Sequence, residues 1–389
     1  MNLKLTPTKL KGAITPPPSK SYAHRALIAA ALAGGASRLT NLAHSQDIMA
    51  TRRCLEALAS PEELPVLDCG ESGSTLRFLI PIVLALRGLG RFTGQGRLME
   101  RPQKPYFDLF DEKGIFYEYK DGILTVKGRL SPGEYRLPGD VSSQFVTGLL
   151  FALPRLDGDS RIVLTTPLES RDYVEMTLAV MNHFGVSVTE TADGWSVPGN
   201  QAYTPNSLDI EADWSQAGFW YAALGLGNQP DIQGLNPDSA QGDMRILSYY
   251  NLLIQAGDVE LDVSQCPDLV PPLAAHAAVR QGTTRIINAE RLRIKESDRL
   301  ATVTEVLNAL GAKITEGQDH LIIEGRPSLP GGVSISAHND HRIAMMAAIA
   351  ATCCEHPIVI TGAQCVAKSY PNFWEEYVRL GGIIEEVSQ

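Results

Sequence analysis

The sequence predicts a mixed α/β (α+β) fold of two domains, each built from three related units of helices and strands. The length of 389 residues is about 2.6 times that of a typical domain of ~150 residues. One kind of amphipathic helix recurs along the chain, and strand-like hairpins follow several of its copies. The composition, with 44% hydrophobic and 20% charged residues, is that of a globular chain.

The recurring helix is amphipathic and ends on a small residue, usually glycine. Glycine there caps a helix in the left-handed conformation, where a side chain would clash. We expect six copies, at 51–59, 105–114, 173–185, 243–257, 299–311 and 372–381. Their ends lie roughly 55 to 72 residues apart, which indicates six units grouped as two domains of three.

Strand hairpins follow three of these helices, at 115–128, 186–199 and 312–325. The first two contain Asp-Gly, and we expect both to turn at that dipeptide, as tight hairpins prefer. The first unit is short. Only residues 61–68 separate its helix from the next motif, and no hairpin fits there.

A second kind of helix begins with small polar or charged residues and continues as an Ala-rich, apolar run typical of a buried helix. Copies are expected at 19–33, 71–86, 142–153, 213–226, 266–279 and 339–351. Helix N-termini carry unpaired N–H groups and attract anions. For any one copy, simple capping explains the polar start better than an anion site does. Four cations close to these starts favour an anion site instead: Lys20, Arg25, Arg77 and Arg342.

The net charge of −10 argues against a general binder of nucleic acid or anionic membranes, because both need an extended basic surface. Any basic site is therefore local. The longest apolar runs, 26–36 and 343–354, are shorter than the roughly 18 residues of a membrane span. The first run starts too far from the N-terminus for a secretory leader.

The six cysteines show neither metal-ligand spacing nor a disulfide framework. We therefore expect a reduced, cytoplasmic protein without a metal.

Residues 291–300 combine Arg291, Arg293, Lys295 and Arg299 with Glu296 and Asp298. They fit either a salt-bridged helix start or a cationic clamp beside an acid/base carboxylate, and the segment alone does not decide between these two interpretations.

His341 alone suits a structural role better than a catalytic one. Asp268 fits a helix cap or a partly desolvated acid, and the direction of its pKa shift stays open, because burial and nearby cations oppose each other.

Ten motifs along nearly the whole chain resemble the 5-enolpyruvylshikimate-3-phosphate synthase family of enolpyruvyl transferases. In order they are PPSKSYAHR, ESGSTLRFL, ERPQKPY, DVSSQF, ESRDYVEMT, ADWSQA, CPD, RIKESDR, NDHRIAM and AKSYPNF. The resemblance implies two domains of three βαβαββ-like units, with inner helices, outer sheets and the ligands in the cleft between domains. It implies a discontinuous domain at 1–18 and 212–389 and an inserted domain at 19–211.

The implied reaction transfers the enolpyruvyl group of phosphoenolpyruvate to the 5-hydroxyl of shikimate 3-phosphate and releases phosphate, by addition and elimination. The carboxylates for proton transfer would be Asp268 and Glu296, with Lys20 and Lys295 as further shuttles. The contacts to shikimate 3-phosphate would be Lys20, Ser21, Arg25, Ser142, Ser143, Gln144, Ser170, Arg171, Tyr173, Asp268 and Lys295. Those to phosphoenolpyruvate would be Lys20, Gly73, Arg101, Gln144, Arg299, Arg342 and Lys368.

The family further implies a cytoplasmic enzyme of aromatic amino acid biosynthesis that uses no cofactor or metal and binds neither nucleic acid nor membranes. We expect a monomer. Family members carry Gly or Ala at the position of Gly73, and Gly implies sensitivity to glyphosate. The sequence departs from the family at the short first unit, at Glu71, where many members have Asn, and at Arg291, where some have Asn.

Three rival functions are less consistent with the residues. The enolpyruvyl transferases that act on UDP-N-acetylglucosamine pair the active-site lysine with Asn and carry a reactive loop cysteine, whereas Ser21 follows Lys20 here and no such cysteine motif occurs. A non-catalytic anion-binding module would gain nothing from Asp268 and Glu296. A phosphoryl-transfer enzyme would be expected to carry a GxxxxGK[ST] loop, and this chain has none.

Overall fold

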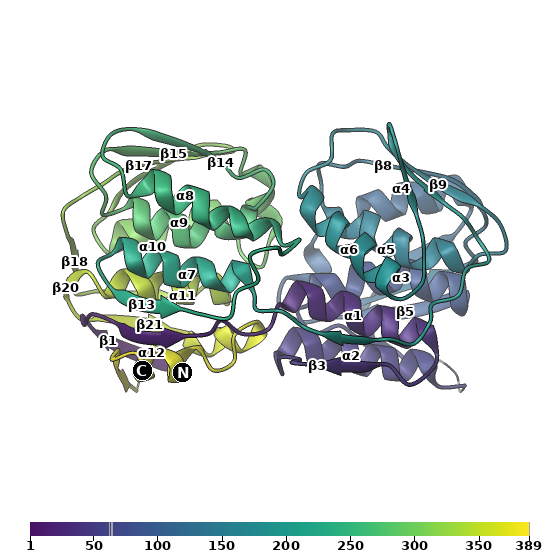
Figure 1. Cartoon of the computed structure of the whole chain (residues 1–389), viewed down its shortest axis with the longest axis horizontal. Coiled ribbons are helices and arrows are strands. Elements are labelled where there is room, and N and C mark those ends of the chain that lie inside the picture. Colours follow the sequence, from purple (N-terminus) through teal and green to yellow (C-terminus); the bar gives the residue numbers. More distant parts are fainter. Residues whose placement is uncertain (62, 64, 389) are drawn as a thin grey trace. The chain divides into compact units, whose positions relative to one another are not determined.

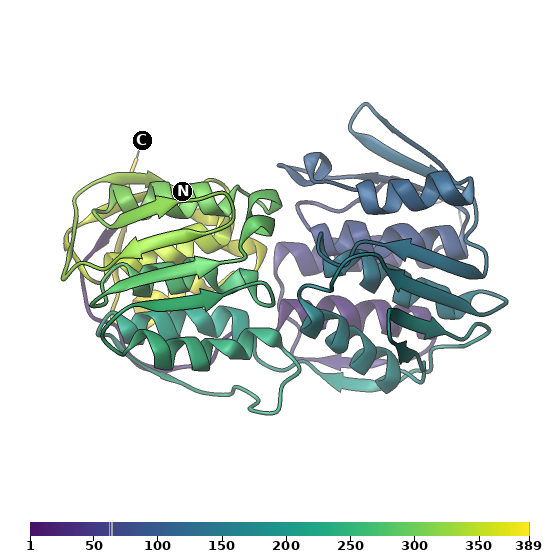
Figure 2. The same cartoon turned by 90° about the horizontal axis from the view of Figure 1, so that it is seen from above.

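The computed structural model describes residues 1–61, 63 and 65–388. The chain divides into two compact units: unit 1 is Met1–Ser19 with Ala212–Gln389, and unit 2 is Lys20–Glu211. Within each unit the helices gather in the interior and strands lie on the outside (Figures 1 and 2). The predicted mixed fold of helices and strands is confirmed.

Unit 2 begins at the helix that carries Lys20. Its helices are α1 (Lys20–Ala33), α2 (Gln46–Ala59), α3 (Gly73–Leu86), α4 (Lys104–Lys113), α5 (Ser143–Ala152) and α6 (Arg171–His183), with 3₁₀ turns η1 (Leu98–Glu100) and η2 (Leu153–Arg155). Its strands are β3 (Arg38–Thr40), β4 (Leu67–Asp68), β5 (Leu89–Thr93), β6 (Phe116–Lys120), β7 (Ile123–Lys127), β8 (Gly133–Leu137), β9 (Ser160–Leu164), β10 (Thr189–Thr191), β11 (Gly194–Val197) and β12 (Ser207–Asp209).

Unit 1 contains both termini of the chain. Its helices are α7 (Trp214–Gly225), α8 (Ile246–Leu253), α9 (Val270–Ala277), α10 (Arg299–Ala309), α11 (His341–Ala351) and α12 (Phe373–Arg379). Its 3₁₀ turns are η3 (Gly242–Arg245), η4 (Pro267–Leu269), η5 (Glu290–Ile294) and η6 (Ala363–Lys368). Its strands are β1 (Asn2–Thr6), β2 (Lys11–Ile14), β13 (Gln229–Ile232), β14 (Val259–Asp262), β15 (Thr283–Ile287), β16 (Lys313–Glu316), β17 (Leu321–Glu324), β18 (Leu329–Gly331), β19 (Ser334–Ser336), β20 (Cys354–His356), β21 (Ile358–Thr361) and β22 (Ile383–Glu386).

Four sheets repeat one topology, in which a parallel strand pair is extended by an antiparallel pair. Their orders are β4-β5-β7-β6 and β8-β9-β11-β10 in unit 2, and β14-β15-β17-β16 and β19-β21-β1-β22 in unit 1. In each, one helix lies between the parallel strands in the chain, and in three of them a second helix precedes both antiparallel strands. In the fourth, α12 precedes β22 alone, and the N-terminal strand β1 takes the place of the other antiparallel strand. This is the recurring unit that the sequence predicts.

Two further repeats form only a parallel pair. Strand β3 follows α1 and pairs in parallel with β12, and strand β13 follows α7 and pairs in parallel with β2. The predicted absence of a hairpin after α2 concerns residues 61–68, of which 62 and 64 lie outside the described residues. The sequence did not predict the second short repeat, in which α8 is followed directly by β14 of the next sheet.

Glycines follow several of the amphipathic helices as expected, but the helix expected at 243–257 is wrong at its end, because α8 stops at Leu253 with Ile254 as its C-cap, before Gly257. Gly114 caps α4 at φ 66°, and Gly311 follows α10 at φ 104°. The hairpin β6–β7 turns at Asp121-Gly122, both at positive φ. The predicted turn of the second hairpin is wrong by one residue: Thr191 pairs with Gly194, so Ala192 and Asp193 form the turn.

The apolar helices lie in the core of each unit. All residues of α11 are buried, as are most of those of α3 and α5. Burial of apolar surface on this scale is the main source of each unit's stability. Over the residues that the structure describes, no helix is both long and apolar enough to cross a membrane.

Candidate functional site

Unit 1 gathers three carboxylates and three cations where η4, α10 and α11 begin. Asp268 lies in η4, Arg299 is the first residue of α10, and Arg342 is in the first turn of α11. Aspartates cap both helices: Asp298 accepts from Ala301 N at 3.2 Å and Asp340 from Arg342 N at 3.0 Å. Such caps satisfy backbone donors that a helix start leaves free, and they fix the first turns that carry the arginines.

Arg299 is the centre of this cluster. Its guanidinium donates from Nη1 to Asp268 Oδ1 at 2.8 Å, from Nη2 to Glu296 Oε2 at 2.6 Å and from Nε to Asp340 Oδ2 at 2.8 Å. The Arg299 side chain is 1% exposed and that of Asp340 is fully buried. Burial alone would lower the pKa of Arg299, but the three carboxylates outweigh it and raise that pKa further. The arrangement holds Asp268 and Glu296 on one rigid cation.

Asp268 is held by two more cations. Arg342 Nη2 lies 3.2 Å from Asp268 Oδ2, and Lys295 Nζ lies 3.5 Å from Asp268 Oδ1. The other contact of Arg342 Nη2 is Ser215 Oγ, at 2.5 Å. The side chains of Asp268 and Lys295 keep 22% and 24% exposure, so both remain within reach of a solute.

Burial and neighbouring charges act in opposite directions on the pKa values of Asp268 and Lys295. Burial alone would raise the pKa of Asp268, but the charges of Arg342, Lys295 and Arg299 outweigh it and hold that pKa well below its usual value. Burial lowers the pKa of Lys295 to about 8, although Asp268 partly offsets the effect. Lys295 is therefore an amine that exchanges its proton close to neutral pH.

Residues 291–300 contain both a salt-bridged helix start and a cationic clamp, and different residues form each of them. Arg293 donates to Asp298 Oδ2 at 2.9 Å and Glu316 Oε1 at 2.8 Å, which makes it part of a salt-bridged helix start. Lys295, Glu296 and Arg299 instead form the cluster around Asp268. Arg291 donates to the backbone oxygen of Ser264.

Lys368 and His341 lie beside the same helix start in unit 1. Lys368 is 3% exposed and donates to the backbone oxygen of Asn339 at 2.5 Å, next to the α11 cap. His341 is 1% exposed, with Nδ1 4.0 Å from Asp340 Oδ1.

In unit 2, Lys20 begins α1 and forms an ion pair with Asp47 of α2, at 2.7 Å. Arg25 is 2% exposed and donates to the backbone oxygens of Ser21 and Tyr173 and to Thr177 Oγ1, each at 2.8 Å. Burial lowers the pKa of Arg25 to about 10. Arg25 therefore ties α1 to α6 as well as contributing positive charge.

The start of α5 is organised by Ser142 and Gln144. Ser142 caps the helix by accepting from Gln144 N at 3.3 Å, and Ser143 is its first residue, 6% exposed. The Gln144 side chain accepts from Arg77 Nη1 at 2.9 Å and donates to Ser74 Oγ at 3.0 Å. This bridge joins the N-termini of α5 and α3, two of the predicted anion-binding helix starts.

Arg101 lies against the first residue of α3. A Cβ atom added to Gly73 would be 2.7 Å from Arg101 Nη1 and 3.0 Å from its Cζ. Only glycine gives this guanidinium its place beside the helix start, and Ser72 caps that helix by accepting from Thr75 N at 3.1 Å. Glu71 packs on Gly96 in the adjoining turn, where an added Cβ would be 2.4 Å from Glu71 Oε2.

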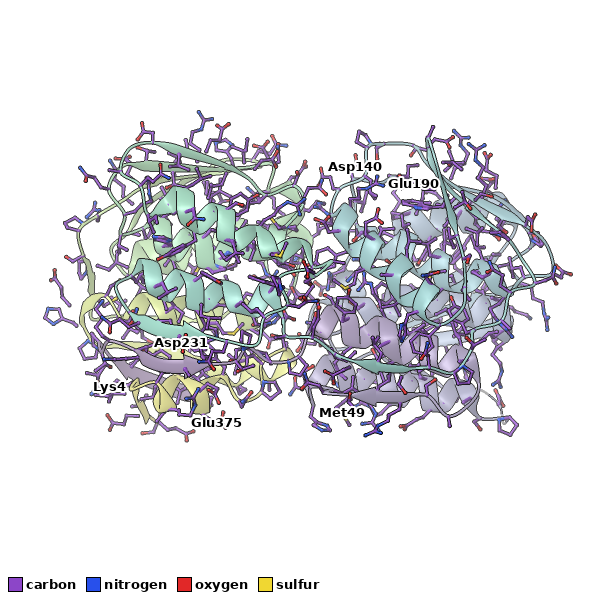
Figure 3. All side chains as sticks on the ribbon, in the orientation of Figure 1. Lys4, Met49, Asp140, Glu190, Asp231 and Glu375 are labelled. Carbon is purple, nitrogen blue, oxygen red and sulfur yellow. The ribbon has the colours of Figure 1, made fainter. Side chains whose placement is uncertain are left out.

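The residues at the start of α6 differ in their surroundings. Ser170 is 3% exposed at a left-handed φ of 53°, and the backbone oxygen of Tyr173 accepts from Arg25. Arg171 is 46% exposed and pairs with Glu175 and with Glu190. Glu190 lies at the surface and is labelled in Figure 3. The structure thus brings Tyr173 to Arg25 and places Arg171 among surface carboxylates.

Sequence reasoning missed Asp47, Ser74 and Ser215, which contact Lys20, Gln144 and Arg342 respectively. Ser74 belongs to the motif ESGSTLRFL and Ser215 to ADWSQA, and they lie in the first turns of α3 and α7. Their position at a helix start could have identified both as site residues. Asp47 lies in none of the ten family motifs. Only the tertiary structure, which buries it beside Lys20, identifies it as a site residue.

Comparison with known proteins points to one family. The sequence model of the family described as "EPSP synthase (3-phosphoshikimate 1-carboxyvinyltransferase)" matches residues 5–377. The chain is 45% identical to a 3-phosphoshikimate 1-carboxyvinyltransferase of Clostridium beijerinckii, over 99% of this chain and 98% of the relative. It is 46% identical to the enzyme of that name from Clostridium kluyveri, over 99% of each.

Solved structures share the fold at lower sequence identity. An EPSP synthase from Acinetobacter baumannii matches with a TM-score of 0.79 at 23% identity, covering 99% of this chain and 100% of the other. The enolpyruvyl transferase NikO from Streptomyces tendae matches with a TM-score of 0.79 at 18% identity, covering 99% and 98%.

Proposed function

The chain belongs to the EPSP synthase family, and from this premise we propose that its two clusters of charged residues serve the one reaction of that family. The activity is that of a 3-phosphoshikimate 1-carboxyvinyltransferase of the shikimate pathway, which leads to the aromatic amino acids. Its substrates are small molecules. The roles of individual residues given below are our proposals. So are the domains, at 1–18 with 212–389 and at 19–211, whose bounds differ by one residue from those of units 1 and 2.

The unit 2 cluster is proposed to bind shikimate 3-phosphate. Lys20 and Arg25 on α1 supply positive charge, and the N-termini of α1 and α5 supply N–H groups for phosphate and hydroxyl oxygens. The other contacts proposed are Ser21, Ser142, Ser143, Gln144, Ser170, Arg171 and Tyr173 from unit 2 and Asp268 and Lys295 from unit 1. Arg171 would have to leave Glu190 to take part.

Phosphoenolpyruvate carries a phosphate and a carboxylate, and the proposed contacts are cations at helix starts. They are Arg101 beside Gly73 in unit 2, together with Lys20 and Gln144, and Arg299, Arg342 and Lys368 in unit 1. Charge-assisted hydrogen bonds contribute about 1.5–3 kcal/mol each, so several of them offset the repulsion between two anionic substrates. The same cations stabilise negative charge that develops as the intermediate forms.

The proton transfers are assigned to the unit 1 cluster. Asp268 takes the proton of the 5-hydroxyl as its oxygen bonds to C2 of phosphoenolpyruvate, while an acid protonates C3 to give a tetrahedral ketal. Removal of a C3 proton then expels phosphate from C2 and regenerates the enol double bond. We assign the C3 transfers to Glu296, with Lys295 and Lys20 as further shuttles.

The low pKa of Asp268 is compatible with a base that is switched on by substrate. Arg299 and Arg342 hold the Asp268 carboxylate in its ionised form. Substrate anions that compete for these two cations would reduce their stabilisation of Asp268 and raise its affinity for a proton. Lys295, with a pKa of about 8, stays mostly protonated at neutral pH and can return a proton.

We propose that the enzyme acts as a cytoplasmic monomer and is inhibited by glyphosate. The free state of all six cysteines supports a reducing compartment. Gly73, beside Arg101, supports glyphosate sensitivity. Family members carry Gly or Ala at this position, and Gly implies sensitivity.

The observation that carries the proposal is Arg299 binding Asp268, Glu296 and Asp340 at once. The test is phosphate release with phosphoenolpyruvate and either shikimate 3-phosphate or UDP-N-acetylglucosamine as acceptor. Release with the first acceptor alone supports it. Release with the second alone would favour the sugar-nucleotide reaction.

A further inference from the structure

A small cavity in unit 2 is lined in part by Arg101. It measures 320 Å³ and is bounded by α3, by the segment of η1 and α4, and by the hairpin β6–β7. Most of its lining is apolar and comes from Leu76, Met99, Phe107, Tyr119 and Leu124. Ligand pockets span roughly 300–1,000 Å³, so this cavity has room for a molecule with a single ring.

Two polar residues of the lining are incompletely satisfied. Gln103 is 7% exposed and Arg101 is 9% exposed. Within the described part of the chain, neither Gln103 Oε1 nor Arg101 Nε has a hydrogen-bond partner. The Gln103 amide is oriented by its Nε2, which donates to the backbone oxygen of Arg101 at 3.4 Å. A buried acceptor and a buried donor without partners are rare in proteins and call for a physical reason.

The lining also carries charges of both signs. Arg101 and Lys104 are cationic and Glu100 is anionic, and Lys104 is paired at the surface with Asp108. Aromatic side chains, an apolar lining and mixed charges are complementary to a zwitterion with an aromatic ring. A simple anion would gain little from this lining.

We propose that this cavity binds a free aromatic amino acid and that its occupation weakens the binding of phosphoenolpyruvate. The ring packs among Phe107, Tyr119 and Leu124. The carboxylate accepts from Arg101 Nε–H, and the ammonium group donates to Gln103 Oε1. These contacts require small shifts of both side chains, since their polar atoms are closed off from solvent.

The coupling to phosphoenolpyruvate runs through Arg101 and rests on the role proposed for it above. One end of its guanidinium lies against Gly73 at the start of α3, while the Arg101 side chain also lines the cavity. A carboxylate bound at Nε turns the guanidinium away from the helix start. By linkage, phosphoenolpyruvate and the amino acid weaken each other by the same factor, typically about 5- to 150-fold.

The test is titration calorimetry of the whole chain with L-phenylalanine in the absence of either substrate. L-alanine, which lacks the ring, and 3-phenylpropionate, which lacks the ammonium group, are the ligand controls. We expect saturable binding of L-phenylalanine at millimolar concentrations and at least tenfold weaker binding of both controls. Absence of binding would overturn the proposal whatever the enzyme's activity.

Variants locate the binding. Gln103→Leu removes the acceptor at nearly constant size, and we expect it to weaken L-phenylalanine binding about tenfold or more. Gln95→Leu is the matched control, because Gln95 is exposed in the preceding loop and does not line the cavity. Equal binding by the Gln103→Leu variant and the native chain would place the amino acid elsewhere and overturn the site.

A second titration tests the coupling. Saturating L-phenylalanine should raise the Kd of phosphoenolpyruvate at least about fivefold, and saturating phosphoenolpyruvate should raise that of L-phenylalanine by the same factor. Binding of both without mutual effect would overturn the coupling. An enzyme without turnover still gives both Kd values, so failure of this inference is distinct from failure of the proposed function.

Discussion

The carboxylate of Asp268 lies 2.8 Å from Nη1 of Arg299. Asp268 belongs to η4 and Arg299 opens α10, so the contact joins two segments that are apart in the chain. Because Arg299 also binds Glu296 and the fully buried Asp340, it fixes both proposed acid/base carboxylates relative to the core of unit 1. Turnover should therefore respond to small changes at these positions.

Asp268→Asn keeps the shape of the side chain and removes its charge and basicity. We expect kcat for phosphate release to fall about 10²- to 10⁴-fold, the usual worth of a general base, while shikimate 3-phosphate binding stays measurable by calorimetry. Asp231→Asn, at an exposed aspartate of the same unit (Figure 3), is the control. Near-normal kcat in Asp268→Asn would remove Asp268 from the mechanism.

The pKa of about 8 for Lys295 predicts a descending limb in the pH profile of kcat/KM. The ammonium form is present below that pH and is lost as the pH rises through it, so anion binding and proton donation decline together. Lys295→Arg, which stays protonated, should shift this limb to higher pH, and Lys295→Met should lower kcat/KM at every pH. An unchanged limb in Lys295→Arg would assign it to another group.

Gly73→Ala should displace Arg101, because the added Cβ would lie 2.7 Å from Nη1. Loss of one charge-assisted contact corresponds to about 10- to 100-fold in affinity. We expect KM for phosphoenolpyruvate to rise by that order, with kcat at saturation less affected, and inhibition by glyphosate to weaken. Steady-state kinetics at varied phosphoenolpyruvate, with and without glyphosate, measures both effects. An unaltered KM would mean that Arg101 does not contact this substrate.

His276 predicts a pH dependence of stability. It is 4% exposed, and burial together with the charge of Arg280 lowers its pKa to about 4 from 6.5. The unfolded chain therefore binds a proton below pH 6.5 that the folded chain refuses, and stability falls as the pH drops toward 4. The loss amounts to about 3 kcal/mol.

Urea unfolding at pH 7 and pH 4 checks this effect. In His276→Gln the difference between the two pH values should be smaller than in the native chain by about 3 kcal/mol. An equal difference in both proteins would show that His276 does not contribute to acid lability.

Local chemistry made the helices and most hairpins predictable from sequence. Glycine is needed at φ 66° after α4 and at φ 104° after α10, and the apolar runs of α3 and α11 are buried as their composition indicates. The turn of β10–β11 was misplaced because pairing of Thr191 with Gly194 overrides the preference for Asp-Gly. Register depends on the neighbouring strand β9 as well as on the turn.

The individual contacts of the site depend on tertiary structure and were less predictable. Asp47 meets Lys20 from another helix, and Ser215 meets Arg342 across 127 positions of sequence. No local pattern encodes such distances. Conversely, Arg171 belongs to the motif ESRDYVEMT but pairs with Glu190, because α6 presents it to the surface. The direction of the Asp268 pKa shift likewise required the positions of three cations.

The central claim is that Lys20 of unit 2 and Asp268 of unit 1 serve the same reaction. Phosphate release from phosphoenolpyruvate, with and without shikimate 3-phosphate, should be measured in the native chain, Lys20→Met, Asp268→Asn and the surface control Lys127→Met. We predict release that requires both substrates in the native chain and in Lys127→Met, and a loss of at least about 100-fold in each of the other two variants. Release without shikimate 3-phosphate, or near-native release in either site variant, would contradict the claim.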